Sequence, residues 1–169
     1  CTDAINTWFG RSDIPIGVSQ KDSLKSFSRY TKQIANRFPN RYVTNADAED
    51  GTVVYRRLLA KAPNKSVVII TIGHLTSLSR LLQSPPDSIS SLSGQALVQQ
   101  KVLKWSCMGG QYPSGKEANF YRPDPASTVT SLALWPQTVV FAGWEVGEKI
   151  VTGGKDFQSQ ADVKSPVYK

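Results

Sequence analysis

Apolar residues in this chain fall into short continuous runs, separated by segments with helical spacing. The continuous runs predict buried strands over residues 66–72, 101–108 and 138–142, and the first of them is rich in Val and Ile. The first run does not alternate with polar residues, so we expect helices to cover both of its faces, as in a parallel sheet. Apolar positions three and four residues apart predict helices between the strands, at 46–62, 77–83, 93–100 and 125–135. This alternation predicts an α/β fold: an open, mostly parallel sheet flanked by helices, of Rossmann-like type.

The two ends of the chain carry weaker patterns. Apolar positions within residues 5–9, followed by Gly10, predict a short helix that stops at the glycine. Residues 14–18 predict a short strand, and the polar stretch that follows is expected to be irregular, with one helix near 26–37. The tail after residue 152 shows no strong signal. We interpret residues 1–169 as one partial domain, because the first predicted helix lacks the element that would precede it.

The chain begins with Cys1, and its single methionine is Met108, so we expect that a segment upstream has been removed. Two interpretations stay open: the modified cysteine of a lipid-anchored bacterial protein, or a fragment of a longer chain. The second is favoured, because the residues after Cys1 predict a helix and not a flexible polar tether. The cellular location is left open. Cys107 lies in an apolar stretch and is expected to be a buried thiol, and no framework pattern supports a disulfide with Cys1.

Composition is that of a soluble globular protein, with 40% hydrophobic and 20% charged residues. No apolar run is long enough to span a bilayer. The formal net charge of +7 invites a nucleic-acid interpretation. However, the basic residues are spread along the chain, and the densest stretch, 29–41, carries no recognition motif although Tyr30 and Phe38 are interleaved with it. We therefore expect solvated helix and loop faces and no nucleic-acid partner.

Ligands of open parallel sheets bind beyond the carboxyl ends of the strands. The three predicted strands are each followed by glycine, which lets the backbone turn tightly or approach a ligand: Gly73, Gly109 with Gly110, and Gly143. These segments also carry a resemblance. Their residues are TIGHLTSL (71–78), MGG (108–110), EANF (117–120), DP (124–125) and FAGWEVG (141–147).

In this order and placement, the segments resemble the inosine–uridine-preferring nucleoside hydrolase family, and residues 6–10 and 13–17 fit a helix and strand near that family's amino end. The resemblance implies hydrolysis of the N-glycosidic bond of a ribonucleoside, assisted by Ca²⁺ held by carboxylates. It also implies that Thr76 offers its backbone carbonyl to the ion. Glu117 and Asn119 would bind ribose hydroxyls, with Met108 near the sugar.

Each of these residues also has a structural interpretation. Thr76 could begin a helix as its N-cap, and Met108 could pack in the core. Glu117 and Asn119 could be solvated loop residues. For Asp124 and its following proline, the start of a helix is preferred over a catalytic role. His74 occupies a variable position of the family's turn and is given no role.

The chain also departs from the family pattern. Nothing in it matches the Asp-rich motif D-x-D-x-x-x-D-D, which supplies the general base and most calcium ligands and would fall before Cys1. A later Asp ligand would fall beyond Val167, and Ser77 stands where many relatives have Asn. No catalytic residue is therefore assigned. We expect a ribonucleoside N-ribohydrolase completed by another chain or by a second copy, or else an inactive nucleoside-binding or protein-interaction module of the same fold. The preferred base is not indicated.

Overall fold

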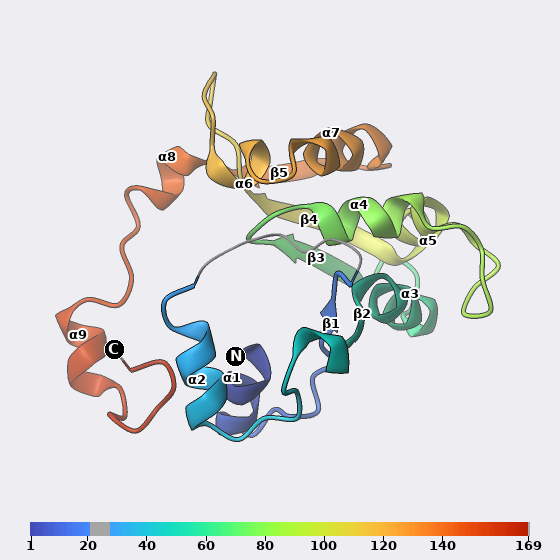
Figure 1. The fold of residues 1–169 in the computed structure, drawn as a ribbon. Helices are drawn as coiled ribbons and strands as arrows, with labels where there is room; N and C mark the ends of the chain where they lie inside the picture. The colour runs from blue at the N-terminus through green and yellow to red at the C-terminus, as the bar shows by residue number, and fades with distance from the viewer. Residues whose placement is uncertain (21–27, 169) are drawn as a thin grey trace.

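The central sheet of the computed structural model, which describes residues 1–20 and 28–168, consists of parallel strands in the order β3-β4-β5 (Figure 1). Their bounds are Val67–Thr71, Val102–Met108 and Val139–Ala142. In register, Thr71 lies opposite Cys107 and Cys107 lies opposite Phe141. The predicted open, parallel α/β architecture is confirmed, and all three strands end at the same edge.

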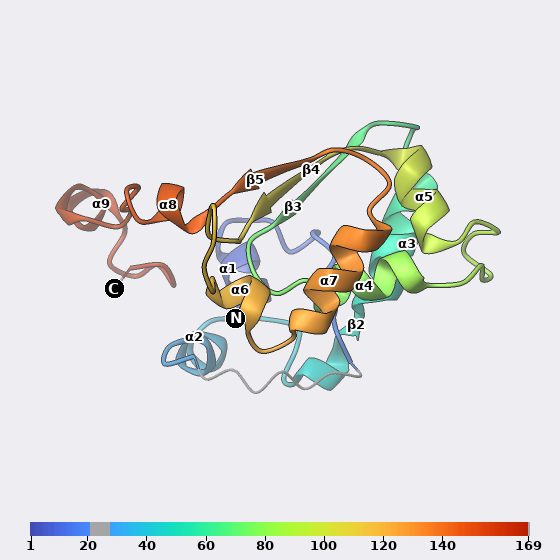
Figure 2. The same cartoon turned by 90° about the horizontal axis from the view of Figure 1, so that it is seen from above.

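Four helices follow the predicted pattern and gather on one side of this sheet (Figure 2). They are α3 (Gly51–Lys61), α4 (Thr76–Gln83), α5 (Gly94–Lys101) and α7 (Pro125–Leu134). The core lies between them and the sheet, because their apolar stripes face the strands. Its most deeply buried members are Leu75, Leu78, Leu81, Leu97, Val98, Val102, Trp105 and Cys107. Cys107 is the buried free thiol that its apolar surroundings predict, and Cys1 is also free.

The opposite face of the sheet is open, and the prediction that both faces of 66–72 are covered is wrong. Val68 and Ile70 are 47% and 67% exposed, whereas Ile69 between them is buried. Lys104 lies beside Val68 in the adjacent strand and belongs to the same open face. Side chains alternate between the faces with a period of two, and the four helices pack against only one of them. A continuous apolar run therefore does not show whether one face or both faces of a strand are covered.

The amino-terminal part contains α1 (Thr2–Trp8), β1 (Gly17–Val18), α2 (Thr31–Arg37), the 3-10 turn η1 (Asn45–Asp47) and β2 (Glu49–Asp50). The first helix ends as expected before Gly10, whose φ of +69° suits glycine. The strand predicted over 14–18 shrinks to two residues that pair in parallel with β2. Residues 26 and 27 of the helix predicted near 26–37 lie outside the described residues.

Helix α3 begins later than its pattern predicts. The Asp50 side chain accepts a hydrogen bond of 2.8 Å from the backbone N–H of Thr52, which makes Asp50 the N-cap. Residues 46–50 therefore lie in η1, in β2 and in the bend at Ala48 between them, instead of in the predicted helix 46–62. The start of α3 is therefore set by its N-cap, Asp50, and not by the spacing of apolar residues.

Short helices complete the chain: α6 (Ala118–Tyr121), α8 (Trp144–Gly147) and α9 (Lys155–Gln160). After β5 the chain leaves the sheet, and its end returns beside α1 and α2 (Figure 1). Among the described helices, none combines the length and the hydropathy that crossing a bilayer requires.

Arg56 corrects the expectation that the basic residues lie on solvated faces. Its side chain on α3 is 1% exposed. The guanidinium donates to both carboxylate oxygens of Asp87, at 2.7 and 2.8 Å, and to the Ser84 hydroxyl at 2.9 Å. It also donates to the carbonyls of Ser90 and Leu92. One buried cation thus fastens the loop between α4 and α5 onto α3.

The same contact predicts how stability depends on pH. The Arg56 guanidinium beside it lowers the pKa of Asp87 from 3.8 to about 2. A carboxyl whose pKa is depressed in the folded protein stabilises it above the unfolded value and loses that contribution as pH falls towards the folded value. We expect the stability difference between wild type and Asp87→Asn, measured by urea unfolding, to be full above about pH 5 and to decline as the pH falls through 3.8 towards about 2. Asp162→Asn, at an exposed site, should show little difference at any pH, and a pH-independent gap for Asp87→Asn would contradict the assignment.

Candidate functional site

The candidate site lies at the carboxyl end of β4, where the chain is joined to the segment after β5. The Gly109 N–H donates to the Ala142 carbonyl at 3.1 Å, and the Trp144 N–H donates to the Gly110 carbonyl at 2.9 Å. Gly110 has a φ of +84°, and a Cβ at Gly109 would lie 2.3 Å from the Phe120 ring. Both glycines are therefore required, one for its backbone conformation and one for a close approach.

Glu117 organises this segment through its carboxylate. It accepts hydrogen bonds from the backbone N–H groups of Gly110, Asn119 and Phe120, at 3.1, 2.9 and 3.1 Å. A fourth comes from the Asn119 side-chain amide at 2.9 Å. These bonds cap α6 and hold the loop against it. The lone pairs of the carboxylate are thereby occupied within the protein.

Asn119 links Glu117 to Met108. Its side-chain nitrogen lies 3.4 Å from the Met108 sulfur as well as 2.9 Å from the Glu117 carboxylate. Met108 is 36% exposed, so it is not the core-packing residue of the alternative interpretation. The carbonyl oxygen of the Asn119 side chain has no hydrogen-bond partner in the described part of the chain. The structure thus brings together Met108, Glu117 and Asn119, leaving one amide oxygen available to a ligand.

Thr76 lies at the end of the neighbouring strand and has a different partner. It is the first residue of α4, with Leu75 as the N-cap, so the interpretation of Thr76 itself as the cap is wrong. Its buried hydroxyl donates to the Asp124 carboxylate at 2.7 Å. Asp124 caps α7 by accepting from the Ser127 N–H, which confirms the helix-start interpretation. Burial opposes ionisation of Asp124, but hydrogen bonds from Ser127 and Thr76 outweigh it and lower its pKa.

The described residues do not by themselves form a calcium site. No group of three or more His, Cys, Asp or Glu side chains among them stands close enough to hold a metal ion. Ca²⁺ requires roughly six to eight oxygen ligands, several of them anionic. The Asp124 carboxylate is already engaged by Thr76 and Ser127. The Thr76 carbonyl as a calcium ligand stays a prediction.

Sequence reasoning missed two residues that shape the loop. The Tyr112 N–H donates to the Glu145 carboxylate at 2.6 Å, and the Tyr112 ring packs 6.0 Å from that of Phe141. This loop also borders a hollow of about 320 Å³ that Phe120 of α6 and Leu132 of α7 help to line. Glu145 belongs to the segment that carries the family resemblance, but its spacing from Tyr112 gives no signal, because the contact forms only when the strands align.

His74, to which the sequence assigns no role, has a buried Nδ1 without a hydrogen-bond partner among the described residues. Comparison with protein families, with characterised proteins and with solved structures found no match to this chain.

Proposed function

We propose that this chain provides the sugar-binding side of a ribonucleoside N-ribohydrolase of the inosine–uridine-preferring type. The observation that carries the proposal is the contact of Asn119 with both Met108 and Glu117 at the carboxyl end of a parallel strand. These are the residues that the family resemblance assigns to ribose, and this is the edge at which such sheets bind ligands.

The geometry suggests how a ribose would bind. The free amide oxygen of Asn119 can accept a hydrogen bond from a sugar hydroxyl. The Glu117 carboxylate could accept a hydroxyl only if it gave up a partner, and the Asn119 side-chain amide is the one it could exchange without losing a backbone cap. The Met108 thioether, which is partly exposed, offers an apolar contact to the sugar ring. Asn119 is therefore the binding residue we expect to matter most.

Hydrolysis needs more than these ribose-binding residues. A bound Ca²⁺ would supply Lewis acidity toward water, and a general base would accept the proton. The described residues do not assemble the carboxylates for either task. We therefore include in the proposal that a complementing chain, or a second copy, brings them.

The absence of a metal-binding cluster among the described residues also favours a second candidate, a nucleoside-binding module without catalysis. The two candidates share the ribose contact and differ in turnover. Titration with inosine and uridine, with ribose release measured in the presence of Ca²⁺, separates them when the chain is assayed together with the polypeptides that copurify with it from its source. Release supports the hydrolase, and binding of intact nucleoside without release supports the module.

Asn119→Leu is the variant that tests the shared site. Loss of one hydrogen bond of about 1.4 kcal/mol weakens binding about tenfold. We expect that increase in the dissociation constant of inosine by calorimetry. Asn36→Leu removes an exposed amide on α2 and should bind as wild type does. If neither nucleoside binds the wild type, or if Asn119→Leu binds equally well, the ribose site is refuted.

A further inference from the structure

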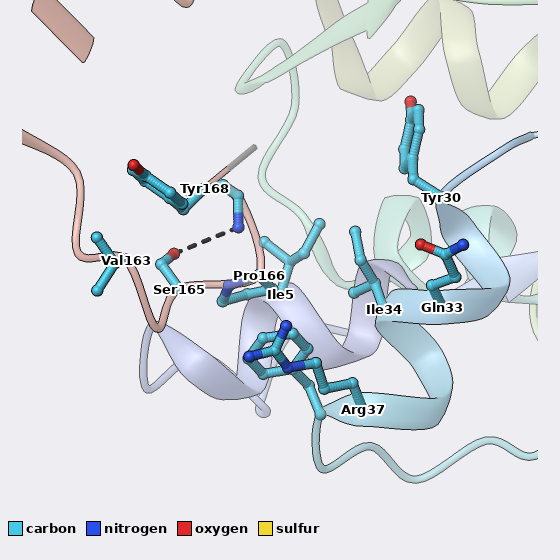
Figure 3. Close-up of a pocket in the computed structure, with 11 residues that line it drawn as sticks. Ile5, Tyr30, Gln33, Ile34, Arg37, Val163, Ser165, Pro166 and Tyr168 are labelled. Atoms are coloured by element: carbon cyan, nitrogen blue, oxygen red, sulfur yellow. Dashed lines mark hydrogen bonds between the residues drawn. The ribbon is translucent and has the colours of Figure 1, made fainter. Parts of the chain in front are cut away.

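A second cavity lies far from these residues in sequence and shares none of them. It has a volume of about 380 Å³ and lies between α1, α2 and the chain end (Figure 3). Ile5 and Ile34 stand in its centre, with Tyr168 on one side and Tyr30 on the other (Figure 3). A volume of this size with mostly apolar walls is typical of small-molecule sites.

The chain end forms one wall of this cavity through a defined turn. The Tyr168 N–H donates to the Ser165 carbonyl at 3.1 Å (Figure 3). Ser165 and Pro166 are buried, so the turn packs firmly against the helices. The Phe38 ring forms part of the other wall. It packs edge-on against the ring of Trp8 in α1, with 5.7 Å between the ring centroids. Three segments distant in sequence thus form the enclosure.

Arg37 gives the cavity its charge. No Asp or Glu lines the cavity, and Arg37 is its one lining residue with a formal charge among the described residues. Other arginines of the molecule are paired with carboxylates, namely Arg11, Arg41, Arg56 and Arg57. Arg37 has no ion-pair partner in the described part of the chain, and its guanidinium lies 5.6 Å from the centre of the Phe38 ring. Its donors are available to an anion placed in the cavity.

We propose that this cavity binds a small amphipathic anion, specifically an aromatic carboxylate. The apolar side chains of Ile5 and Ile34 would contact the ring system, and the Arg37 guanidinium would bind the carboxylate with paired N–H donors. A neutral ligand of the same shape gains the apolar contacts alone. The proposal is independent of the nucleoside site, because the two share no residue.

The test compares 2-naphthoate with neutral 2-naphthamide by calorimetric titration of the wild type and two variants. The carboxylate of naphthoate can form a charge-assisted hydrogen bond with Arg37 that the neutral amide cannot, so we expect naphthoate to bind about tenfold more tightly. Arg37→Gln should remove this preference while leaving naphthamide binding unchanged. Lys32→Gln makes the same charge change on the same helix, at a residue that does not line the cavity, and should keep the preference.

A third variant locates the ligand. Ile34→Trp fills the cavity and should abolish binding of both compounds. Equal affinities of the wild type for the two compounds, a preserved preference in Arg37→Gln, or undiminished binding in a folded Ile34→Trp variant would each overturn the proposal. If Ile34→Trp does not fold, the pair Arg37→Gln and Lys32→Gln decides the question.

Discussion

Replacing Trp105 with alanine is expected to lower the free energy of unfolding by about 4 kcal/mol, within the range for large-to-small changes at buried aromatic residues. Trp105 is fully buried in the central strand β4. Its ring lies 4.7 Å from that of Trp135 on the helical layer and 6.4 Å from that of Phe141 in β5. Truncation would therefore leave a cavity between sheet and helices. Urea denaturation, with the midpoint and slope fitted together, measures the change.

Two variants separate packing from other effects of the tryptophan. Trp105→Phe keeps most of the ring but loses the 2.9 Å hydrogen bond from the indole N–H to the buried Thr71 hydroxyl. We expect that change to cost about 1–3 kcal/mol, because the buried Thr71 oxygen loses the indole donor. Trp144→Ala, at a side chain 48% exposed on α8, should change stability by less than about 0.5 kcal/mol. A loss below about 1.5 kcal/mol for Trp105→Ala would show that the interface is not packed as described.

Arg56→Ala is expected to destabilise the fold by about 3 kcal/mol, because removing a buried guanidinium leaves the polar groups around it without their donor. The variant would leave the Leu92 carbonyl and the Ser84 hydroxyl without the guanidinium donor, and the Ser90 carbonyl would keep only the N–H of Asp87. Arg56→Lys should recover little of the loss, since an ammonium group cannot reproduce the planar fork of donors. Hydrogen exchange of the loop between α4 and α5 should accelerate in both variants.

The neighbouring Arg57 is the matched control. Its guanidinium also pairs with a carboxylate, that of Glu49, but both side chains are more than a third exposed. Exposed ion pairs contribute about 0–1 kcal/mol, so Arg57→Ala should alter the free energy of unfolding by at most that amount. Equal losses for the two arginine variants would contradict a special role for the buried guanidinium.

The parallel sheet and most of the helical layer could be predicted from the pattern along the chain. Strands β3, β4 and β5 and helices α4, α5 and α7 lie within a residue or two of their predicted bounds. Each is encoded by contiguous apolar residues or by a three-to-four spacing, and both signals are local. Met108, Glu117 and Asn119 could be nominated from a motif and its place after a strand, although their nucleoside chemistry stays a proposal.

Other features depended on contacts between residues far apart in the sequence. The open face of the sheet follows from the packing of the helices on one side, which the run of Val and Ile does not reveal. Arg56 looks like a solvated cation in the sequence and is buried because the loop carrying Asp87 folds over it, 31 positions away. The cavity beside Arg37 arises because a tail without a strong pattern returns to α1 and α2.

Local spacing therefore decides which segments become strands and helices, because backbone geometry repeats within a few residues. Tertiary packing decides which face is covered, which charge is buried and which polar atom is left for a ligand. Those outcomes depend on desolvation and on partners brought together across the chain. For this protein, the sequence predicted the elements. Only the folded structure shows that the amide oxygen of Asn119 and the guanidinium of Arg37 have no hydrogen-bonding or ion-pair partner, respectively, among residues 1–20 and 28–168.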